Sequence, residues 1–173
     1  MRNLAVFILA IVLLAPVPQA PSWADARTVA VFDFELIDTS LEGATSGPRA
    51  DEQARLVRAG EQLRARLAAS GLFRLVDMAP VALQARNSNL QACGGCDVRL
   101  AKQVGAELAI TATVQKVSNL ILNLTVYVRD TGTGHPIAVM NADFRGNTDE
   151  SWSRALDWLV RNRLLAPGYG VVP

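Results

Sequence analysis

The sequence is short of the residues that carry catalysis and metal binding. It has one histidine, His135, and two cysteines among 173 residues. His135 stands between a glycine and a proline, a context typical of an exposed turn. The chain has no glycine-rich phosphate loop, no zinc-ligand spacing and no nucleophile elbow. Because an active site needs a nucleophile or metal, a base and a charge-stabilising group, we expect no enzyme, no cofactor and no metal site.

An excess of charge of either sign is also missing. The 17 lysines and arginines and the 16 aspartates and glutamates give a net charge of +1. Removal of Arg2 with the leader described below brings that charge to zero. A neutral domain has no general attraction for nucleic acid or for acidic lipid. We therefore expect neither a nucleic-acid partner nor stable membrane insertion.

Only one long hydrophobic run is present, the eleven residues Leu4–Leu14. It follows Arg2 and is shorter than the roughly 20 residues of a membrane span, so it predicts a signal peptide. An uncleaved N-terminal anchor is the alternative. Small residues favour cleavage after Ala24 or Ala26. The expected organisation is a signal peptide over residues 1–24, a single domain over 27–166 and a C-terminal tail over 167–173, in a periplasmic or secreted protein.

The two cysteines, Cys93 and Cys96, are separated by two glycines. In an oxidising compartment such a pair usually forms a disulfide, so a structural crosslink is predicted. A helix is predicted immediately after the pair, over Asp97–Val104, which leaves a redox-active pair at a helix N-terminus as an alternative. Metal ligation is a further alternative, but it requires two more ligands.

Alternating residues predict a β-hairpin with its turn at Lys116–Leu120. One face is apolar and carries Ile110, Ala112, Val114, Leu122, Leu124, Val126 and Val128. The opposite face is polar with one aromatic ring, and carries Thr111, Thr113, Asn123, Thr125 and Tyr127. Such a face suits contact with another protein, with plain solvent exposure as the alternative. We therefore take these five residues as a possible interaction surface.

The segment before the hairpin predicts a β-α-β unit. Thr28–Leu36 is the first strand, with Ala30, Phe32, Phe34 and Leu36 expected on one face. Asp33 lies within this apolar strand, so we expect it to face solvent or to pair with an arginine. The predicted loop Asp38–Ala50 precedes a helix over Asp51–Ser70, whose apolar stripe is Leu56, Val57, Gly60, Leu63 and Leu67. Its arginines are expected to form ion pairs, with an anionic partner as the alternative.

The remaining elements complete the order β-α-β-(α)-α-β-β-β-α. They are a strand at Leu72–Asp77, a short helix at Pro80–Arg86, a strand at Ile137–Phe144 and a last helix. Asn147 and Glu150 have the spacing of a capping box at the start of that helix. This pattern predicts an α+β domain, in which a mixed sheet carries helices mostly on one face.

Three segments resemble a group of exported bacterial domains. They are VAVFDFEL, GLFRLVD and QVGAELAITATVQKVSNLILNLTVYVRDTGTG. The group includes the N-terminal domain of the Tol-system translocation protein, the curli-secretion lipoprotein and the lipoprotein activators of penicillin-binding proteins. The chain is also similar to a family of small secreted bacterial proteins that consist of this domain alone. It departs from the lipoproteins by lacking a cysteine near the leader, and from the Tol protein by lacking a propeller.

The resemblance implies a mixed sheet used as an interaction module in the cell envelope. We therefore expect an exported, non-catalytic accessory protein whose partner is another envelope protein. A small-ligand-binding periplasmic protein is the alternative. A thiol-disulfide redox protein that uses Cys93 and Cys96 is the second alternative.

Overall fold

The computed structural model describes residues 26–166, and the predicted signal peptide over 1–24 and the tail over 167–173 lie outside them. The strands are β1 (Arg27–Asp38), β2 (Phe73–Leu75), β3 (Leu108–Lys116), β4 (Leu122–Asp130) and β5 (Pro136–Phe144). The helices are α1 (Leu41–Ser46), α2 (Ala50–Ser70), α3 (Ala82–Arg86), α4 (Cys96–Gln103) and α5 (Asp149–Leu159). A 3-10 turn, η2 (Ala79–Val81), precedes α3, and a π-helical turn, η3 (Val160–Leu164), follows α5.

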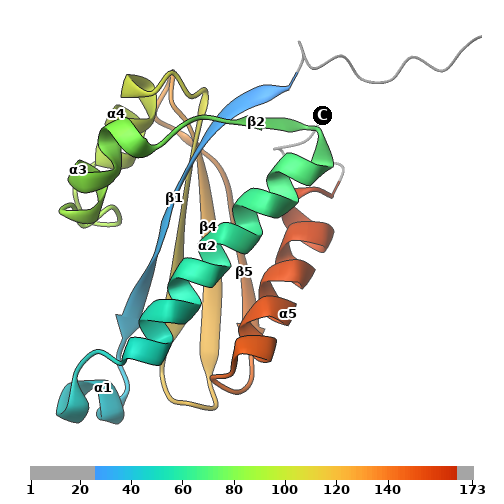
Figure 1. Ribbon diagram of the computed structural model, residues 1–173. Helices are drawn as coiled ribbons and strands as arrows, with labels where there is room; N and C mark the ends of the chain where they lie inside the picture. The colour runs from blue at the N-terminus through green and yellow to red at the C-terminus, as the bar shows by residue number, and fades with distance from the viewer. Residues whose placement is uncertain (1–25, 167–173) are drawn as a thin grey trace, which may run out of the picture.

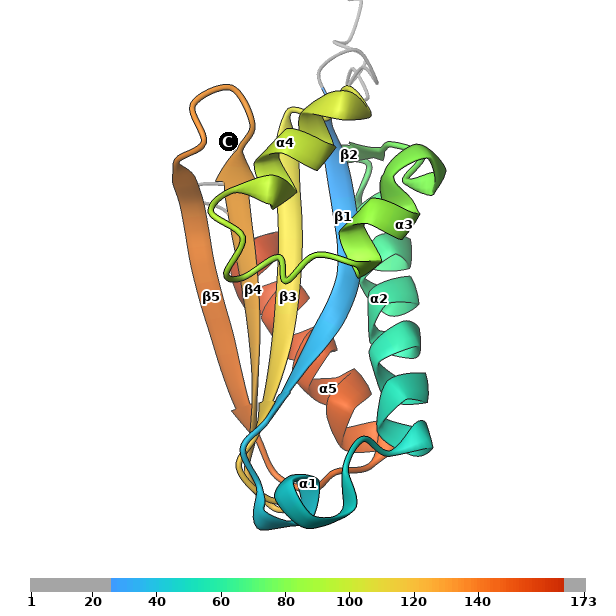
Figure 2. The same cartoon turned by 90° about the vertical axis from the view of Figure 1, so that its left-hand side faces the viewer.

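The five strands form one mixed sheet in the order β2-β1-β3-β4-β5. β1 is parallel to β2 and β3, whereas β3, β4 and β5 form an antiparallel meander. The two long helices α2 and α5 cover one face, and the short helices α3 and α4 lie over one end of the other face (Figures 1 and 2). The predicted α+β mixed sheet with most of its helical residues on one face is confirmed. Within residues 26–166 no helix has the length and apolar character needed to cross a bilayer.

The main core lies between the sheet and the helices α2 and α5. The alternation of the hairpin is confirmed, because Ile110, Val126 and Val128 are completely buried on this side. The stripe of α5 and η3 packs against the same face through Trp152, Leu156, Leu159, Val160 and Leu164. A smaller core lies under α3 and α4 on the opposite face, and includes Phe32, Leu90 and Leu100. Burial on both faces fixes which side chains of each strand point to which helices.

The prediction that Ala30, Phe32, Phe34 and Leu36 share one face of β1 is wrong beyond Phe32. Val31 pairs with Ile110 and Phe34 pairs with Ala112, so Phe32 and Asp33 together lie opposite one residue of β3. This β-bulge shifts the side-chain alternation by one position. Ala30 and Phe32 therefore enter the smaller core, whereas Phe34, and Leu36 at its margin, pack in the main core.

Three further sequence expectations need correction. The predicted loop over 38–50 contains α1, whose first turn is capped by the Ser40 hydroxyl accepting the N–H of Gly43 at 3.1 Å. The capping box of α5 is formed by Thr148 and Ser151, one residue after the predicted pair. Val57 of the predicted stripe is 60% exposed, because it lies on the flank of α2 beside the buried residues.

The arginines of α2 form ion pairs, as expected. Arg55 and Arg58 both contact Asp149 at 2.8 Å, and Arg66 contacts Asp157 at 2.8 Å, so charges on α2 join it to α5. At least one partner of each pair is exposed to solvent, which screens the charges, so the pairs contribute little to the stability of the fold. The acids that pair with these arginines belong to the same domain.

A buried charge network closes the end of the sheet at which β1 and β3 finish. The side chain of Lys116 is 1% exposed, and its Nζ lies 2.7 Å from Glu52, 2.8 Å from Glu42 and 3.3 Å from Asp38. Glu52 is completely buried and also accepts a hydrogen bond from the side-chain amide of Asn147 at 2.7 Å. Burial alone would lower the pKa of Lys116, but hydrogen bonds to these carboxylates raise it above its ordinary value. The ammonium group therefore stays charged, and it joins β1, α1, α2 and β3.

Replacement of Lys116 by methionine tests this network. The variant keeps the length of the side chain but takes away the nearest cation of the buried Glu52 and leaves only Arg49 at 4.0 Å, so we expect the free energy of unfolding to fall by about 3–5 kcal/mol. Urea unfolding followed by circular dichroism measures the loss, and the double variant Glu52→Gln/Lys116→Met should recover part of it. The control Arg154→Met removes an exposed pair with Glu150 and should cost less than about 0.5 kcal/mol. A loss for Lys116→Met no larger than that of the control would contradict a buried network.

Candidate functional site

The short strand β2 leaves most of β1 without a neighbour on one side. β2 pairs only with Arg27–Val29, and the last bond of this ladder runs from the N–H of Val76 to the carbonyl of Val29 at 3.0 Å. The chain then turns at Asp77, whose carboxylate accepts the N–H of Ala79 at 3.0 Å. α3 follows, on the face of the sheet opposite to the one that α2 covers (Figure 2). Within the described residues, β1 is therefore an edge strand from Ala30 onward.

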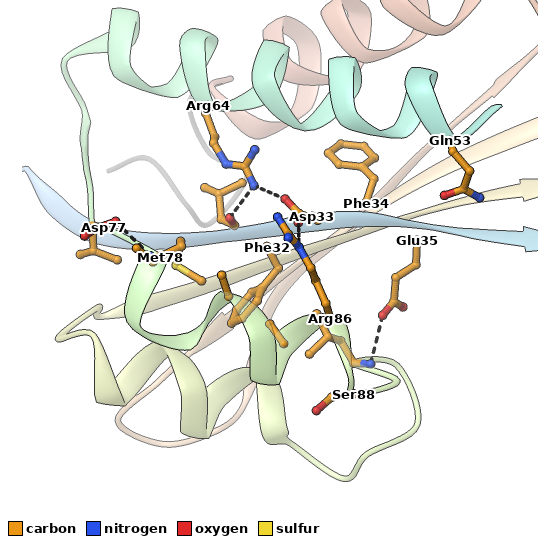
Figure 3. A pocket seen from close by; sticks show the side chains of 16 residues that line it. Phe32, Asp33, Phe34, Glu35, Gln53, Arg64, Asp77, Met78, Arg86 and Ser88 are labelled. Carbon is orange, nitrogen blue, oxygen red and sulfur yellow. Dashed lines mark hydrogen bonds and ion pairs between the residues drawn. The ribbon is translucent and has the colours of Figure 1, made fainter. Parts of the chain in front are cut away.

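A groove of about 580 Å³ lies along this edge, with α2 on one side and the segment 76–90 on the other. Figure 3 shows β1 between these two walls, with Phe34 pointing toward α2 and Phe32 pointing toward α3. Gly60 of α2 lies over Phe34, where a β-carbon would be 3.7 Å from the ring and 3.2 Å from the guanidinium of Arg64. Because glycine has no side chain, α2 can lie close to β1 and form a wall directly beside the strand.

An ion-pair cluster crosses the mouth of the groove. The bulge turns Asp33 toward the edge, where it meets Arg64 from α2 at 2.7 Å and Arg86 from α3 at 3.4 Å (Figure 3). Arg64 Nη2 also donates to the backbone carbonyl of Val31 at 3.1 Å. Partial burial would raise the pKa of Asp33, but the two guanidinium groups outweigh it and lower that pKa. The expected pairing of Asp33 with an arginine is confirmed.

A second carboxylate in the groove has a different environment. Glu35 accepts the backbone N–H of Leu90 at 3.1 Å and points to the α3 side of β1 (Figure 3). It takes part in none of the ion pairs that the described residues form. Burial raises the pKa of Glu35, and the hydrogen bond from Leu90 only partly offsets that effect. Glu35 is therefore a half-buried acid whose charge is not balanced within the domain.

The groove combines charged and apolar side chains. Its polar groups are two arginines, three acids, a glutamine and a serine around an apolar floor. None of these is a nucleophile held by a base. In the part of the chain that the structure describes, no group of three or more histidine, cysteine or acidic residues could hold a metal ion. His135 is exposed in the turn between β4 and β5.

The other predicted residues lie apart from the groove. Cys93 and Cys96 form a disulfide with a Cα–Cα distance of 5.7 Å, in the turn that begins α4. Thr111 and Thr113 are only 4% and 3% exposed, which removes them from the predicted interaction surface. Thr111 accepts a hydrogen bond from Gln91 in the loop before α4, and Thr113 lies between Glu35 and Thr125 on neighbouring strands.

Three members of that surface, Asn123, Thr125 and Tyr127, are half-buried on the outer sheet face. α3 and α4 cover only one end of this face (Figure 2). The register of the strands places two exposed apolar side chains, Ile37 and Val139, on the same face, and two more, Val117 and Ile121, are exposed in the turn between β3 and β4. Neither these four residues nor the groove can be predicted from the pattern of a single element.

The disulfide is predicted to act as a local crosslink. Closing so short a loop removes little chain entropy, so Cys93→Ser/Cys96→Ser should lower the free energy of unfolding by at most about 2 kcal/mol. Thermal unfolding of both proteins measures this change. Repeated reduction of insulin by the wild type, in the presence of a thiol donor, would instead support redox activity.

The ion pair of Asp33 predicts a pH effect of defined sign. Because its pKa in the folded state is below 3.8, its contribution to stability is present above about pH 3.8 and is lost as the pH falls through the folded-state pKa. We expect Asp33→Asn to be less stable than wild type by under about 1 kcal/mol at pH 7, since the carboxylate is 56% exposed. The difference should begin to shrink as the pH falls below about 3.8 in urea titrations. A constant difference from pH 7 to pH 3 would assign the effect to something other than charge.

Several solved structures match the chain. The C-terminal domain of LpoB from Salmonella enterica matches with a TM-score of 0.51 and 19% identity, over 69% of this chain and 82% of that domain. Lipoprotein GNA1162 from Neisseria meningitidis matches with a TM-score of 0.44 and 18% identity, over 79% of this chain and 92% of that one. PelC from Paraburkholderia phytofirmans, solved as a dodecamer, matches with a TM-score of 0.46 and 12% identity, over 82% and 92%.

At these identities the likeness shows the fold alone, which is LpoB-like. These three structures include neither a Tol-system nor a curli-secretion protein, so those parts of the resemblance gain no support from them. No curated protein matches the chain. A family model described as "Protein of unknown function (DUF2380)" matches residues 27–164, and the chain therefore belongs to this family, DUF3280.

Proposed function

We propose that this chain is an exported, non-catalytic interaction module of the bacterial cell envelope and that it binds another envelope protein. The observation that carries the proposal is the free edge of β1, which opens into the groove between α2 and α3. Unpaired strand edges attract other polypeptide chains, and natural proteins normally cover or disrupt them unless they are used. The predicted signal peptide and the LpoB-like fold support an envelope location.

The outer sheet face next to this edge extends the proposed surface. Thr125 and Tyr127 provide polar and aromatic contact area, and Ile37, Val117 and Val139 add exposed apolar side chains. Protein interfaces combine these features, whereas isolated exposed apolar residues are common on any surface. Here Ile37 and Val139 share the face of the sheet that α3 and α4 cover only at one end (Figure 2).

Small-ligand binding in the groove is the second candidate. A volume of about 580 Å³ lies in the range of small-molecule sites, and an apolar floor with a few polar groups is their usual lining. Unlike a partner protein, a small ligand would occupy the groove without contacting the outer sheet face.

Photo-crosslinking in intact cells tests the proposed function. A photoreactive amino acid at Gln53 in the groove, or at Val139 on the outer face, should give a covalent adduct with an envelope protein, identified by mass spectrometry. The same amino acid at Ala65, which lies on the outward side of α2, is the matched control. Equal adducts from all three positions, or none from Gln53 and Val139, would contradict the proposal. A small molecule that co-purifies and is displaced by groove variants would favour the second candidate.

A further inference from the structure

The edge of β1 has a regular stretch on the C-terminal side of the bulge. Register with β3 is continuous from the pair Phe34–Ala112 to the pair Asp38–Lys116, and no strand of the described chain lies on the other side. These five residues are close to the usual length of a strand. Alternate backbone N–H and C=O groups of such a stretch point away from the sheet and can receive an added strand.

At the bulge, between Val31 and Asp33, the same edge is already occupied by side chains. Arg64 donates to the carbonyl of Val31, and Asp33 holds Arg64 and Arg86 across the edge. A bulge and charged residues are the usual means of preventing strand addition. Only the stretch Phe34–Asp38 therefore remains open to another backbone.

The groove overlaps the open stretch at Phe34 and Glu35, and there its walls provide places for the side chains of an added strand. Side chains of a strand alternate between its two faces, so one set would lie toward α2 and the other toward the α3 side. On the α2 side, Val57 is exposed one helical turn after Gln53, which lines the groove. On the other side the lining includes Ala82, Ala85 and Leu90. Apolar side chains suit both walls.

The three carboxylates along this part of β1 differ in whether a cation pairs with them. The charge of Asp33 is balanced by two arginines, and Asp38 is paired with Lys116. Glu35 lies between them on the strand and has no cation within ion-pair distance in the described residues. Its carboxylate faces the groove on the α3 side (Figure 3). A half-buried carboxylate favours a cation from whatever occupies the groove, and it disfavours an anion.

We infer that the stretch Phe34–Asp38 of β1 binds an extended segment of the partner protein as an added strand, which places a lysine or arginine against Glu35. This inference deepens the proposed function and rests on it. It specifies the occupant as a β-forming peptide with a basic side chain flanked by apolar ones. The register is set by the basic residue, and backbone hydrogen bonds to the edge provide sequence-independent affinity.

A peptide series tests the occupant. Nine-residue peptides of alternating valine and threonine, immobilised at one end, carry a single lysine, glutamine or glutamate that is moved through every position. The labelled mature protein should bind the best lysine peptide at least about tenfold more tightly than its glutamate counterpart. With that lysine peptide in solution, hydrogen exchange of the edge amides between Phe34 and Asp38 should slow, as expected for new backbone hydrogen bonds.

Two charge variants complete the test. Glu35→Gln keeps an oxygen that can accept the Leu90 N–H, so the fold is retained, and it should abolish the preference for lysine over glutamate. Glu61→Gln removes an exposed carboxylate of α2 outside the groove and should leave the preference unchanged. Equal binding of the three peptide types, a preference that survives Glu35→Gln, or no binding at all would overturn the inference. If crosslinks from Gln53 persist in that case, the proposed function stands and only the occupant is wrong.

Discussion

The contact between the Lys116 ammonium and the Glu52 carboxylate is the constraint on which the position of α2 depends. Burying two charges costs several kcal/mol for each ion, and a short contact with further hydrogen bonds is needed to offset this cost. The network meets that condition in part, because Glu42 and Asp38 also bind the ammonium and Asn147 binds Oε1 of Glu52, whereas Oε2 of Glu52 has no hydrogen-bond partner in the described residues. The start of α2 therefore has one low-energy position relative to the ends of β1 and β3. That position sets the direction in which α2 runs along β1, and thus one wall of the groove.

The edge of β1 must resist unwanted pairing and yet remain usable. The bulge, Asp33 and the two arginines disrupt the upper part, where the chain leaves the sheet. Below this point the strand is regular, and protection there comes from the charge of Glu35 and from the two walls. A negative charge repels acidic segments and costs little when a basic one arrives. The same residue can therefore make the edge selective without covering it, which is how an exposed strand edge avoids general aggregation.

The sequence predicted what depends on local periodicity. The alternation of the hairpin and the apolar stripe of α5 identify their buried faces, because each pattern lies within one element. The residues that build the groove depend on contacts between distant segments, and no local pattern reports them. The local pattern predicts a turn at Lys116, yet this residue ends β3 and is buried against Glu52, 64 residues away. The bulge at Asp33 reverses the faces of every later residue of β1, and nothing in the strand's composition marks where an extra residue is inserted.

The early end of β2 produces both the free edge and the second wall of the groove. After Leu75 the chain continues as Val76, Asp77, Met78, Ala79 and Pro80. The Asp77 carboxylate binds the N–H of Ala79, and Pro80, which has no N–H to donate, stands at the start of η2. These two residues stop the strand and direct the chain across the edge toward α3. A longer β2 would cover Phe34–Asp38 and would also keep Arg86 away from Asp33. One short turn therefore leaves β1 with a walled edge, and the fold needs no added domain or inserted loop to create the groove.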